Sequence, residues 1–490
     1  MNTFKLTTLV MALALAGCAQ MAPDQNTLAK RDAASVQLSA DIKLAREGWP
    51  EAQWWSAYHD TQLDALIQQA LSSNPSLDKA AAQIGRALSG VQRSAADLGV
   101  GADLYANANR QRYSGTGLFP APIGGAYFSE ETLRLEARYN FDWWGKNKAQ
   151  IAAAVGQVNV GRAAYAQAEQ ALSSAIAQSY FRLQGGWARS ANLAQMIEAQ
   201  DALVQDKARR ISHGLASADE QRTAETELRL MQKQQAQFDA DIGREKEALR
   251  SLLGVDGSAA TADANALVQN LQPRAMEAAP HTLPARLGLE LLARRPDLQA
   301  ARWRVQAALS QIDVAKAAFY PDVNLSGSIG LDSISYEHLL SAPSRTLFLG
   351  PTLTMPLFDS KRLNAELANA RSARNEAIAD YNLAVIQAAR DVAQDAVQLQ
   401  GIEQQIARQQ QAGAGAAAQL HSAQSRLQAG LADHGSVLNA RLALLRQQDA
   451  DLSLQQMQLL AEVALTNALG GGYRDMGTPP AATTTAAASQ

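Results

Sequence analysis

Few side chains in this sequence could perform covalent chemistry. Cys18 is the only cysteine, so no disulfide can form within the chain. The six histidines are scattered singly, and the HExxH, GxxxxGK[ST] and GxSxG patterns do not occur. The sequence therefore predicts a protein that is not an enzyme and that holds no metal and no cofactor. A formal charge of −3 argues against a nucleic-acid partner, which a basic surface would have to hold.

The segment before Cys18 is typical of protein export. Lys5 precedes a short apolar stretch, and small residues lead up to the cysteine in Leu15-Ala16-Gly17-Cys18. A positive start, an apolar run of this length and small residues before a cut predict a signal peptide over residues 1–17. A signal peptide of this kind implies that the mature chain is exported from the cytoplasm.

The cysteine at the predicted cut resembles that of a bacterial lipobox, which implies a covalent lipid on Cys18. Ala19 follows it, where an aspartate would favour retention in the inner membrane, so we expect the outer membrane. Residues 18–46 would then form a lipid-anchored polar tether. The alternative is an ordinary signal peptide with a chance cysteine.

The rest of the chain repeats itself at a spacing of about 216–221 residues. The matching pairs keep a common order and include Asn74-Pro75 with Arg295-Pro296, Phe141-Asp142 with Phe358-Asp359, Gly214-Leu215 with Gly430-Leu431, and Leu253-Gly254 with Leu469-Gly470. Each half predicts a helix, two strands, a long helix and a shorter helix. The expected fold class is therefore mainly α with a small β part and an internal twofold repeat.

Two proline-free stretches, from Lys146 to about His213 and from Lys361 to about Ala429, predict very long helices. At 1.5 Å per residue each could extend about 100 Å. Mostly apolar residues recur every seven positions, at Ile176, Leu183, Ser190, Ile197, Val204 and Ile211 and again at Ile378, Val385, Val392, Leu399 and Ile406. A seven-residue repeat requires a neighbouring helix and a left-handed supercoil. A free coiled-coil rod would carry the same pattern, so the helices alone do not decide the function.

Four segments alternate between apolar and polar residues as strands do: 102–112, 131–142, 322–332 and 346–358. Each is about as long as a strand that crosses a bilayer at a tilt, whereas no stretch offers the roughly 18 apolar residues of a spanning helix. Four strands cannot close a barrel, and open sheet edges are not tolerated in lipid. Three chains with four strands each would close a shared barrel. Its pore should be lined by Arg134, Glu136 and Arg138, because burying these charges in lipid would be costly.

At this point the sequence resembles the TolC family of outer-membrane efflux ducts, the outer membrane factors, in its acylated NodT-type branch. Within that branch it is similar to the MdtP-type multidrug-resistance outer-membrane proteins. The resemblance covers about residues 47–472 and depends on motifs in combination: Gly48-Trp49-Pro50, Trp54-Trp55, Tyr139-Asn140-Phe141-Asp142-Trp143-Trp144-Gly145-Lys146, Leu291-Leu292-Ala293-Arg294-Arg295-Pro296-Asp297-Leu298, Pro356-Leu357-Phe358-Asp359 and Gly470-Gly471-Gly472-Tyr473.

The resemblance implies a homotrimer whose β-barrel is continued by a long α-helical barrel in the periplasm. It implies a periplasmic adaptor and an inner-membrane pump as partners, with passive export of drugs or other small toxic compounds across the outer membrane. The expected organisation is a first repeat over residues 47–254, a connector in an equatorial region over 255–284, a second repeat over 285–472 and a disordered tail over 473–490.

The two long helices end in turns that match the tunnel tips of the family. The residues that would touch the adaptor are Arg210, Gly214, Leu215, Arg426, Gly430 and Leu431. Glycine also suits a helix end on its own account, because it tolerates positive φ, so plain helix caps are the alternative.

Acidic residues follow both turns, and the family implies a periplasmic gate there. Threefold symmetry would turn each of Asp433, Glu220 and Asp219 into a ring of charge. The alternative is that Asp219 and Asp433 are N-caps of the helices that follow, or first-turn acids that the positive end of the helix dipole favours. Two other functions stay open, a type I protein-secretion duct and a lipid-anchored periplasmic scaffold.

Overall fold

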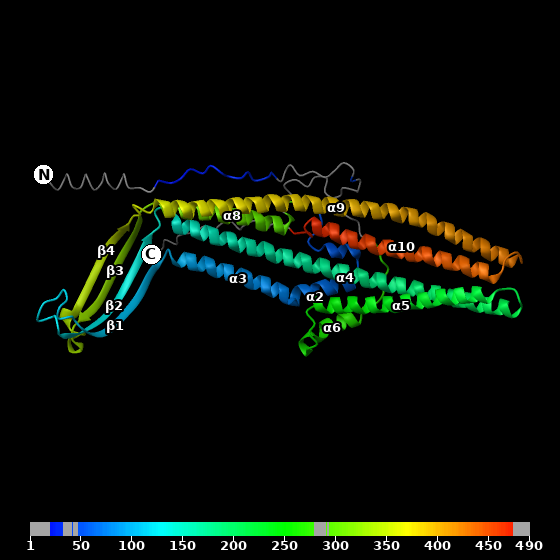
Figure 1. Cartoon of the computed structure of the whole chain (residues 1–490), viewed down its shortest axis with the longest axis horizontal. Helices are drawn as coiled ribbons and strands as arrows, with labels where there is room; N and C mark the ends of the chain where they lie inside the picture. Colours follow the sequence, from blue (N-terminus) through cyan, green and yellow to red (C-terminus); the bar gives the residue numbers. More distant parts are fainter. Residues whose placement is uncertain (1–19, 33–41, 43–47, 279–290, 292–293, 474–490) are drawn as a thin grey trace, which may run out of the picture. The chain divides into compact units, whose positions relative to one another are not determined.

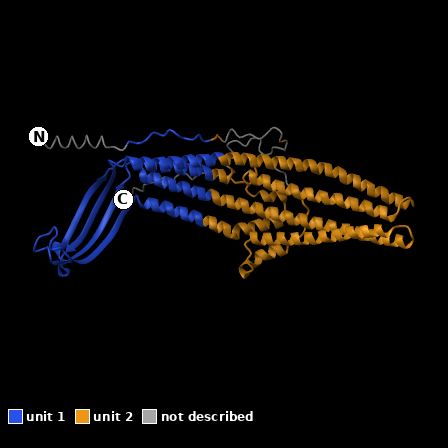
Figure 2. Cartoon of the chain, in the orientation of Figure 1, with its two compact units in different colours: residues 1–30, 82–162, 300–382 blue, residues 31–81, 163–299, 383–490 orange. Residues whose placement is uncertain are grey.

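The computed structural model describes residues 20–32, 42, 48–278, 291 and 294–473 (Figure 1). Contacts divide the chain into two compact units (Figure 2). Unit 1 comprises residues 1–30, 82–162 and 300–382, and unit 2 comprises 31–81, 163–299 and 383–490. The elements are η2 (Trp54–Tyr58), α2 (Thr61–Ser73), α3 (Pro75–Ala96), β1 (Val100–Arg112), β2 (Tyr127–Phe141), α4 (Lys146–Ser212), α5 (Ala218–Leu252), η3 (Ala259–Thr261), α6 (Ala262–Gln269), α8 (Pro296–Ala317), β3 (Asp322–Ser333), η4 (Tyr336–His338), η5 (Ala342–Ser344), β4 (Arg345–Thr354), α9 (Ser360–Gln428) and α10 (His434–Ala468).

Unit 1 contains one antiparallel sheet in the order β1-β2-β3-β4 (Figure 1). Its register places Leu104 opposite Leu135, Leu135 opposite Ile329 and Ile329 opposite Leu347. Because residues that face each other across strands lie on the same side of a sheet, these apolar side chains share one face. The prediction of four strands with alternating character is confirmed.

Two strand ends differ from the sequence prediction by four residues, and the other ends lie within two residues of it. β2 begins at Tyr127, four residues before the predicted start, because residues 127–130 pair with Arg112–Asn109 of β1. β4 ends at Thr354, although the alternation continues to residue 358. Thr354 pairs with Asp322, the first residue of β3, so the ladder ends where the partner strand begins.

The long helices begin and end close to the predicted residues, and they include 67 residues in α4 and 69 in α9. Asp142 fixes the start of α4, since its carboxylate accepts from the N–H groups of Asn147 and Lys148, each at 2.9 Å. In unit 2 the predicted heptad positions Leu183, Val392 and Leu399 are fully buried. The seven-residue pattern therefore marks the packed side of each helix.

Both halves of the chain have helices of matching length. α3 and α8 each have 22 residues, and α5 and α10 each have 35. Together with two strands and one long helix in each half, this is the predicted twofold repeat.

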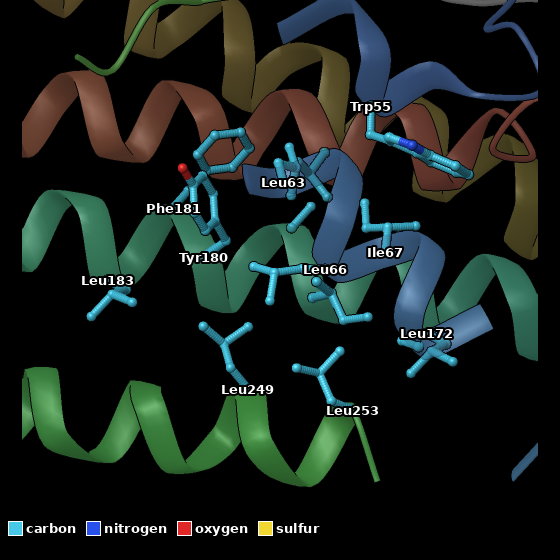
Figure 3. Packing of buried hydrophobic residues seen from close by; sticks show 14 of the residues in the cluster. Trp55, Leu63, Leu66, Ile67, Leu172, Tyr180, Phe181, Leu183, Leu249 and Leu253 are labelled. Carbon is cyan, nitrogen blue, oxygen red and sulfur yellow. The ribbon is translucent and has the colours of Figure 1, made fainter. Parts of the chain in front are cut away.

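A large core cluster lies in unit 2, where α2 packs against α4 and the end of α5 (Figure 3). Leu63, Leu66 and Ile67 form one face of α2, since a spacing of three to four residues returns to the same side of a helix. All three are completely buried, and they meet Tyr180 of α4 and Leu249 of α5. Burying each of these aliphatic side chains stabilises the fold by roughly 2 kcal/mol.

Gly470-Gly471-Gly472 joins the end of α10 to this region. All three glycines have positive φ, and a Cβ on Gly470 or Gly472 would lie 1.9 Å from the carbonyl oxygen of Arg294 or 1.8 Å from that of Glu51. Only glycine permits so close a backbone approach. The triple glycine is therefore a packing requirement within unit 2.

Candidate functional site

Charged residues form a ladder on the polar face of the sheet in unit 1. Arg134 pairs with Glu136 at 2.7 Å, and Arg138 pairs with Asp103 of β1 at 3.1 Å. The Arg134 guanidinium also lies 5.5 Å from the ring centre of Tyr105, the residue opposite it in the register. The structure thus brings the three predicted barrel residues together on one exposed polar face, while the leucines occupy the other face.

In unit 2, the turn between α4 and α5 is built around Gly214. Its φ of +67° lies in the left-handed region, which glycine adopts without steric cost. The N–H of Leu215 donates to the carbonyl of Arg210 at 2.8 Å, and that of Gly214 donates to Ile211 at 2.9 Å. This pair of bonds is the Schellman arrangement that satisfies the last carbonyls of a helix. It leaves the Leu215 side chain exposed.

The turn between α9 and α10, also in unit 2, has the same construction. Gly430 has a φ of +71°, and the N–H groups of Leu431 and Gly430 donate to Arg426 at 2.8 Å and Leu427 at 3.0 Å. The Leu431 side chain is exposed as well. We name the turn at residues 210–220 the first tip and the turn at residues 426–436 the second tip. Each predicted docking residue lies at one of them.

An ion pair links the two tips. The guanidinium of Arg210 donates to the carboxylate of Asp433, which also caps α10 by accepting from the N–H of Ser436 at 2.8 Å. Hydrogen bonds from the Ser436 hydroxyl and N–H, and then from Arg210, lower the pKa of Asp433 to about 2. Asp433 is therefore charged at neutral pH and holds the first tip against the second.

The other two predicted gate acids also lie beside basic side chains. Glu220 accepts from Lys207 at 2.7 Å, and this bond, followed by the charge of Lys207, lowers the pKa of Glu220. Asp219 pairs with Arg222, one turn further along α5, at 2.9 Å. All three acids thus have a cationic neighbour within the same chain, which reduces the net negative charge that the tips present.

A polar cluster in unit 2 was not predicted as a site. Arg295 donates to both carboxylate oxygens of Asp297, at 3.0 and 2.7 Å, and lies 3.7 Å from Asp391. These residues and Asp395 line a cavity of about 310 Å³. Burial and the charge of Asp391 raise the pKa of Asp395 to about 6, against the opposing effect of Arg295. The spacing of Asp391 and Asp395 by one helical turn was the available signal, but the sequence analysis used Arg295-Pro296-Asp297 only as a marker of the repeat and of the family resemblance.

Two further observations limit what the described residues could do. Within the residues that the structure describes, no group of three or more His, Cys, Asp and Glu side chains is placed to hold a metal ion. No helix in the same part of the chain combines the length and the apolar character that spanning a bilayer requires. Cys18 and the predicted signal peptide lie outside the described residues, as does residue 474 onward of the predicted tail.

Comparison with known proteins agrees with this architecture. The model of the family described as outer membrane efflux protein matches the chain twice, over residues 66–255 and 287–471. Multidrug resistance outer membrane protein MdtP of Escherichia coli K12 is 34% identical over 475 residues, which cover 94% of both chains. The putative multidrug resistance outer membrane protein MdtQ of the same strain is 34% identical over 95% of this chain and 97% of its own.

A solved structure resembles the fold as well. The outer membrane protein VceC of Vibrio cholerae is 31% identical, covers 86% of this chain and all of its own, and gives a TM-score of 0.76. The two family matches coincide with the two structural repeats. This chain therefore belongs to the family of outer membrane efflux proteins, the channel components through which efflux systems cross the outer membrane.

Proposed function

We propose that this protein is the outer-membrane channel of a tripartite efflux system that exports drugs or other small toxic compounds. The observation that carries the proposal is the four-stranded sheet with one apolar and one charged face, in a chain of the efflux family. The related MdtP and VceC proteins are outer membrane proteins, and MdtP is named for multidrug resistance. Transport would be passive, since nothing in the described chain resembles an energy-coupling site.

Assembly as a homotrimer follows from the edges of the sheet. β1 and β4 each pair on one side only. Their free N–H and C=O groups would be costly in lipid, whereas the same groups satisfy one another when β4 of one copy meets β1 of the next. Three copies would close a wall of twelve strands. Arg134, Glu136 and Arg138 would then line its polar interior.

The two tips are the proposed contact with a periplasmic adaptor, which links the channel to an inner-membrane pump. Leu215 and Leu431 support this proposal, because each is an exposed leucine held by a rigid glycine turn. Asp433, Glu220 and Asp219 would form the gate region beside that contact. We also propose that Cys18 carries a lipid that anchors the mature chain to the outer membrane.

Surface labelling of intact cells tests the membrane crossing. Leu118 lies in the loop between β1 and β2 and is 92% exposed, so Leu118→Cys should react with an impermeant maleimide. Leu215→Cys, at the first tip, is the matched control and should react only after the outer membrane is permeabilised. A periplasmic scaffold would leave both positions unlabelled.

Susceptibility measurements test the export role. Deleting the gene should lower the tolerated concentration of antibiotics and dyes, and the plasmid-borne chain should restore tolerance only with its adaptor and pump present. Unchanged drug tolerance together with loss of a secreted protein would instead favour the type I secretion duct.

A further inference from the structure

Residues 20–30 run beside α9 without regular secondary structure (Figure 1). We name this segment the N-terminal strap. It belongs to unit 1, as do the α9 residues up to Asn382 that it contacts (Figure 2). The sequence analysis treated it as part of a polar tether, but its backbone is bound along its length by side chains of α9.

Two asparagines of α9 each bind the strap backbone through both the nitrogen and the oxygen of the side-chain amide. Asn364 donates to the carbonyl of Gln20 and accepts from the N–H of Ala22, both at 2.8 Å. Asn375 donates to the carbonyl of Asn26 at 2.6 Å and accepts from the N–H of Leu28 at 3.3 Å. This pattern satisfies backbone groups two residues apart, as a neighbouring β-strand would.

A third asparagine completes the row. Asn382 donates to the carbonyl of Ala29 at 3.0 Å. Positions 364, 375 and 382 are separated by 11 and 7 residues, about three and two helical turns, so the three side chains share one stripe of α9. The stripe is thus a regular series of amides at nearly whole-turn spacing.

The lengths of the two segments agree. From Asn364 to Asn382 a helix rises about 27 Å. From Gln20 to Ala29 an extended chain at about 3.1 Å per residue covers about 28 Å. The strap therefore stays in step with α9 from its first contact to its last, and the two segments run in the same direction.

Charge fixes the register of the strap. Asp24 binds the guanidinium of Arg374 through both oxygens, at 2.5 and 3.2 Å. Arg374 is only 5% exposed, so without Asp24 it would be a buried cation lacking its carboxylate. At the far end, the ammonium group of Lys30 lies 4.4 Å from the ring centre of the buried Tyr381.

The other end of the strap lies where the helices of unit 1 meet the sheet. Met21 packs beside the cluster of Ile312, Phe319 and Leu363. It also lines a cavity of about 540 Å³ with Trp144 and Tyr320, whose rings stack at 4.6 Å. In the sequence, Gln20 is the second residue after Cys18.

We propose that Asn364, Asn375 and Asn382 form a binding site for an extended peptide, and that its occupant is the chain's own N-terminal strap. The asparagines bind backbone groups, and Asp24 with Arg374 selects the register. The site holds the N-terminal end of the mature chain at the start of α9. If Cys18 carries the lipid of the proposed function, the site binds the chain from the second residue after the anchor onward.

Hydrogen exchange on the purified full-length protein tests the site. The amides of Ala22 and Leu28 should be protected, and Asn364→Ala/Asn375→Ala/Asn382→Ala should speed their exchange about tenfold or more. Asn369→Ala, at an exposed asparagine of α9 outside the three strap contacts, is the matched control and should leave both amides protected. Equal exchange in the wild-type and triple-variant proteins would overturn the proposal.

Two variants that leave α9 unchanged complete the test. Leu28→Pro removes the N–H that Asn375 accepts, and it should speed exchange across the rest of the strap even if the triple variant fails to fold. Cys18→Ser removes the acceptor of the proposed lipid and should leave the strap protected. Protection that disappears in Cys18→Ser would contradict a site made by α9. A wild-type protein that shows a protected strap and no contribution to efflux would count against the proposed function and leave this site intact.

Discussion

The two tips of unit 2 have the same backbone and different charges. Both end a long helix with a glycine at positive φ, a Schellman pair of hydrogen bonds and an exposed leucine. At the next helix start, however, the first tip has Ser217 where the second has Asp433, and Glu220 stands where the second has Ser436. The repeat therefore preserves the shape of the turn and not its electrostatics.

This difference makes the link between the tips one-sided. Arg210 and Arg426 occupy equivalent positions of the two repeats. Arg210 finds the carboxylate of Asp433, whereas Arg426 donates to the Ser422 hydroxyl of its own helix at 3.3 Å. A single exchange of serine for aspartate at a helix cap is thus enough to give two equivalent arginines different partners.

The largest effect should come from the feature that the tips share. Gly214→Val and Gly430→Val should each destabilise their turn by about 2 kcal/mol, because a β-branched residue disfavours the left-handed region. No atom lies within 4 Å of a Cβ at either position, so the cost is confined to the backbone. Hydrogen exchange of the turn amides measures it. Gly243→Ala, in the interior of α5, is the control and should stabilise slightly. Unequal losses of local stability at the two tips would contradict the conclusion that both turns depend on glycine in the same way.

Removing the caps should separate the tips. Asp433→Ala loses a helix cap and the contact with Arg210, and we expect a loss of about 1.5 kcal/mol in the local stability of the second tip. Ser217→Ala loses only a cap whose hydrogen bond to Glu220 is 3.3 Å long, so about 0.5 kcal/mol is expected. Exchange rates of the Ser436 and Glu220 amides report the two effects. Equal losses would mean that the ion pair adds nothing.

Asp433→Ser sharpens the comparison, because it gives the second tip the cap of the first. The cap is retained and only the link to Arg210 is lost, so the expected loss is below about 1 kcal/mol. Arg210→Gln in the same background should then have no further effect on the Ser436 amide. An additional loss in the double variant would show that Arg210 acts on the second tip by another route.

Acid should weaken the second tip more than the first, where the lowered pKa of Glu220 belongs to an exposed ion pair. The pKa of Asp433 is about 2 in the folded chain and about 3.9 for an unfolded aspartate, so the charged form stabilises the fold. This contribution is fully present above pH 4 and is lost as the pH falls from about 4 towards 2. Exchange measured across that range should show the loss at the second tip, and Asp433→Ser should remove it. A second tip insensitive to this range would contradict the assignment.

The smallest effect is expected at Lys207. Its partner Glu220 is exposed to solvent, and exposed ion pairs contribute little. Lys207→Met should therefore leave the thermal midpoint and the exchange of the first tip unchanged. A clear destabilisation would show that the first tip depends on charge as the second does.

The regular elements could be predicted because their signals are local. Heptad positions and the absence of proline predicted α4 and α9, and alternation predicted the four strands. The error at the end of β4 arose because that strand ends opposite Asp322, the first residue of its partner β3. The glycine turns could be predicted equally well, because Gly214 and Gly430 end their helices by adopting a positive φ that other residues disfavour.

The contacts between side chains far apart in the sequence could not be predicted in the same way. Arg210 and Asp433 were predicted at separate sites, as a docking residue and a gate residue, yet they are 223 positions apart and in contact. The row of Asn364, Asn375 and Asn382 shows helical spacing, but its partner lies more than 340 residues earlier in the chain. Residues 20–30 were accordingly taken for a tether.

The sequence by itself determined the helices, the strands, the turns and the repetition of all three, because each depends on neighbours within a few residues. Only the tertiary structure decided which distant polar groups meet: Asp433 with Arg210, Asp24 with Arg374, and Arg295 with Asp391. A charged side chain has many possible partners of opposite sign along the chain. Packing selects among them, because it brings only a few within hydrogen-bond distance and removes the others from reach.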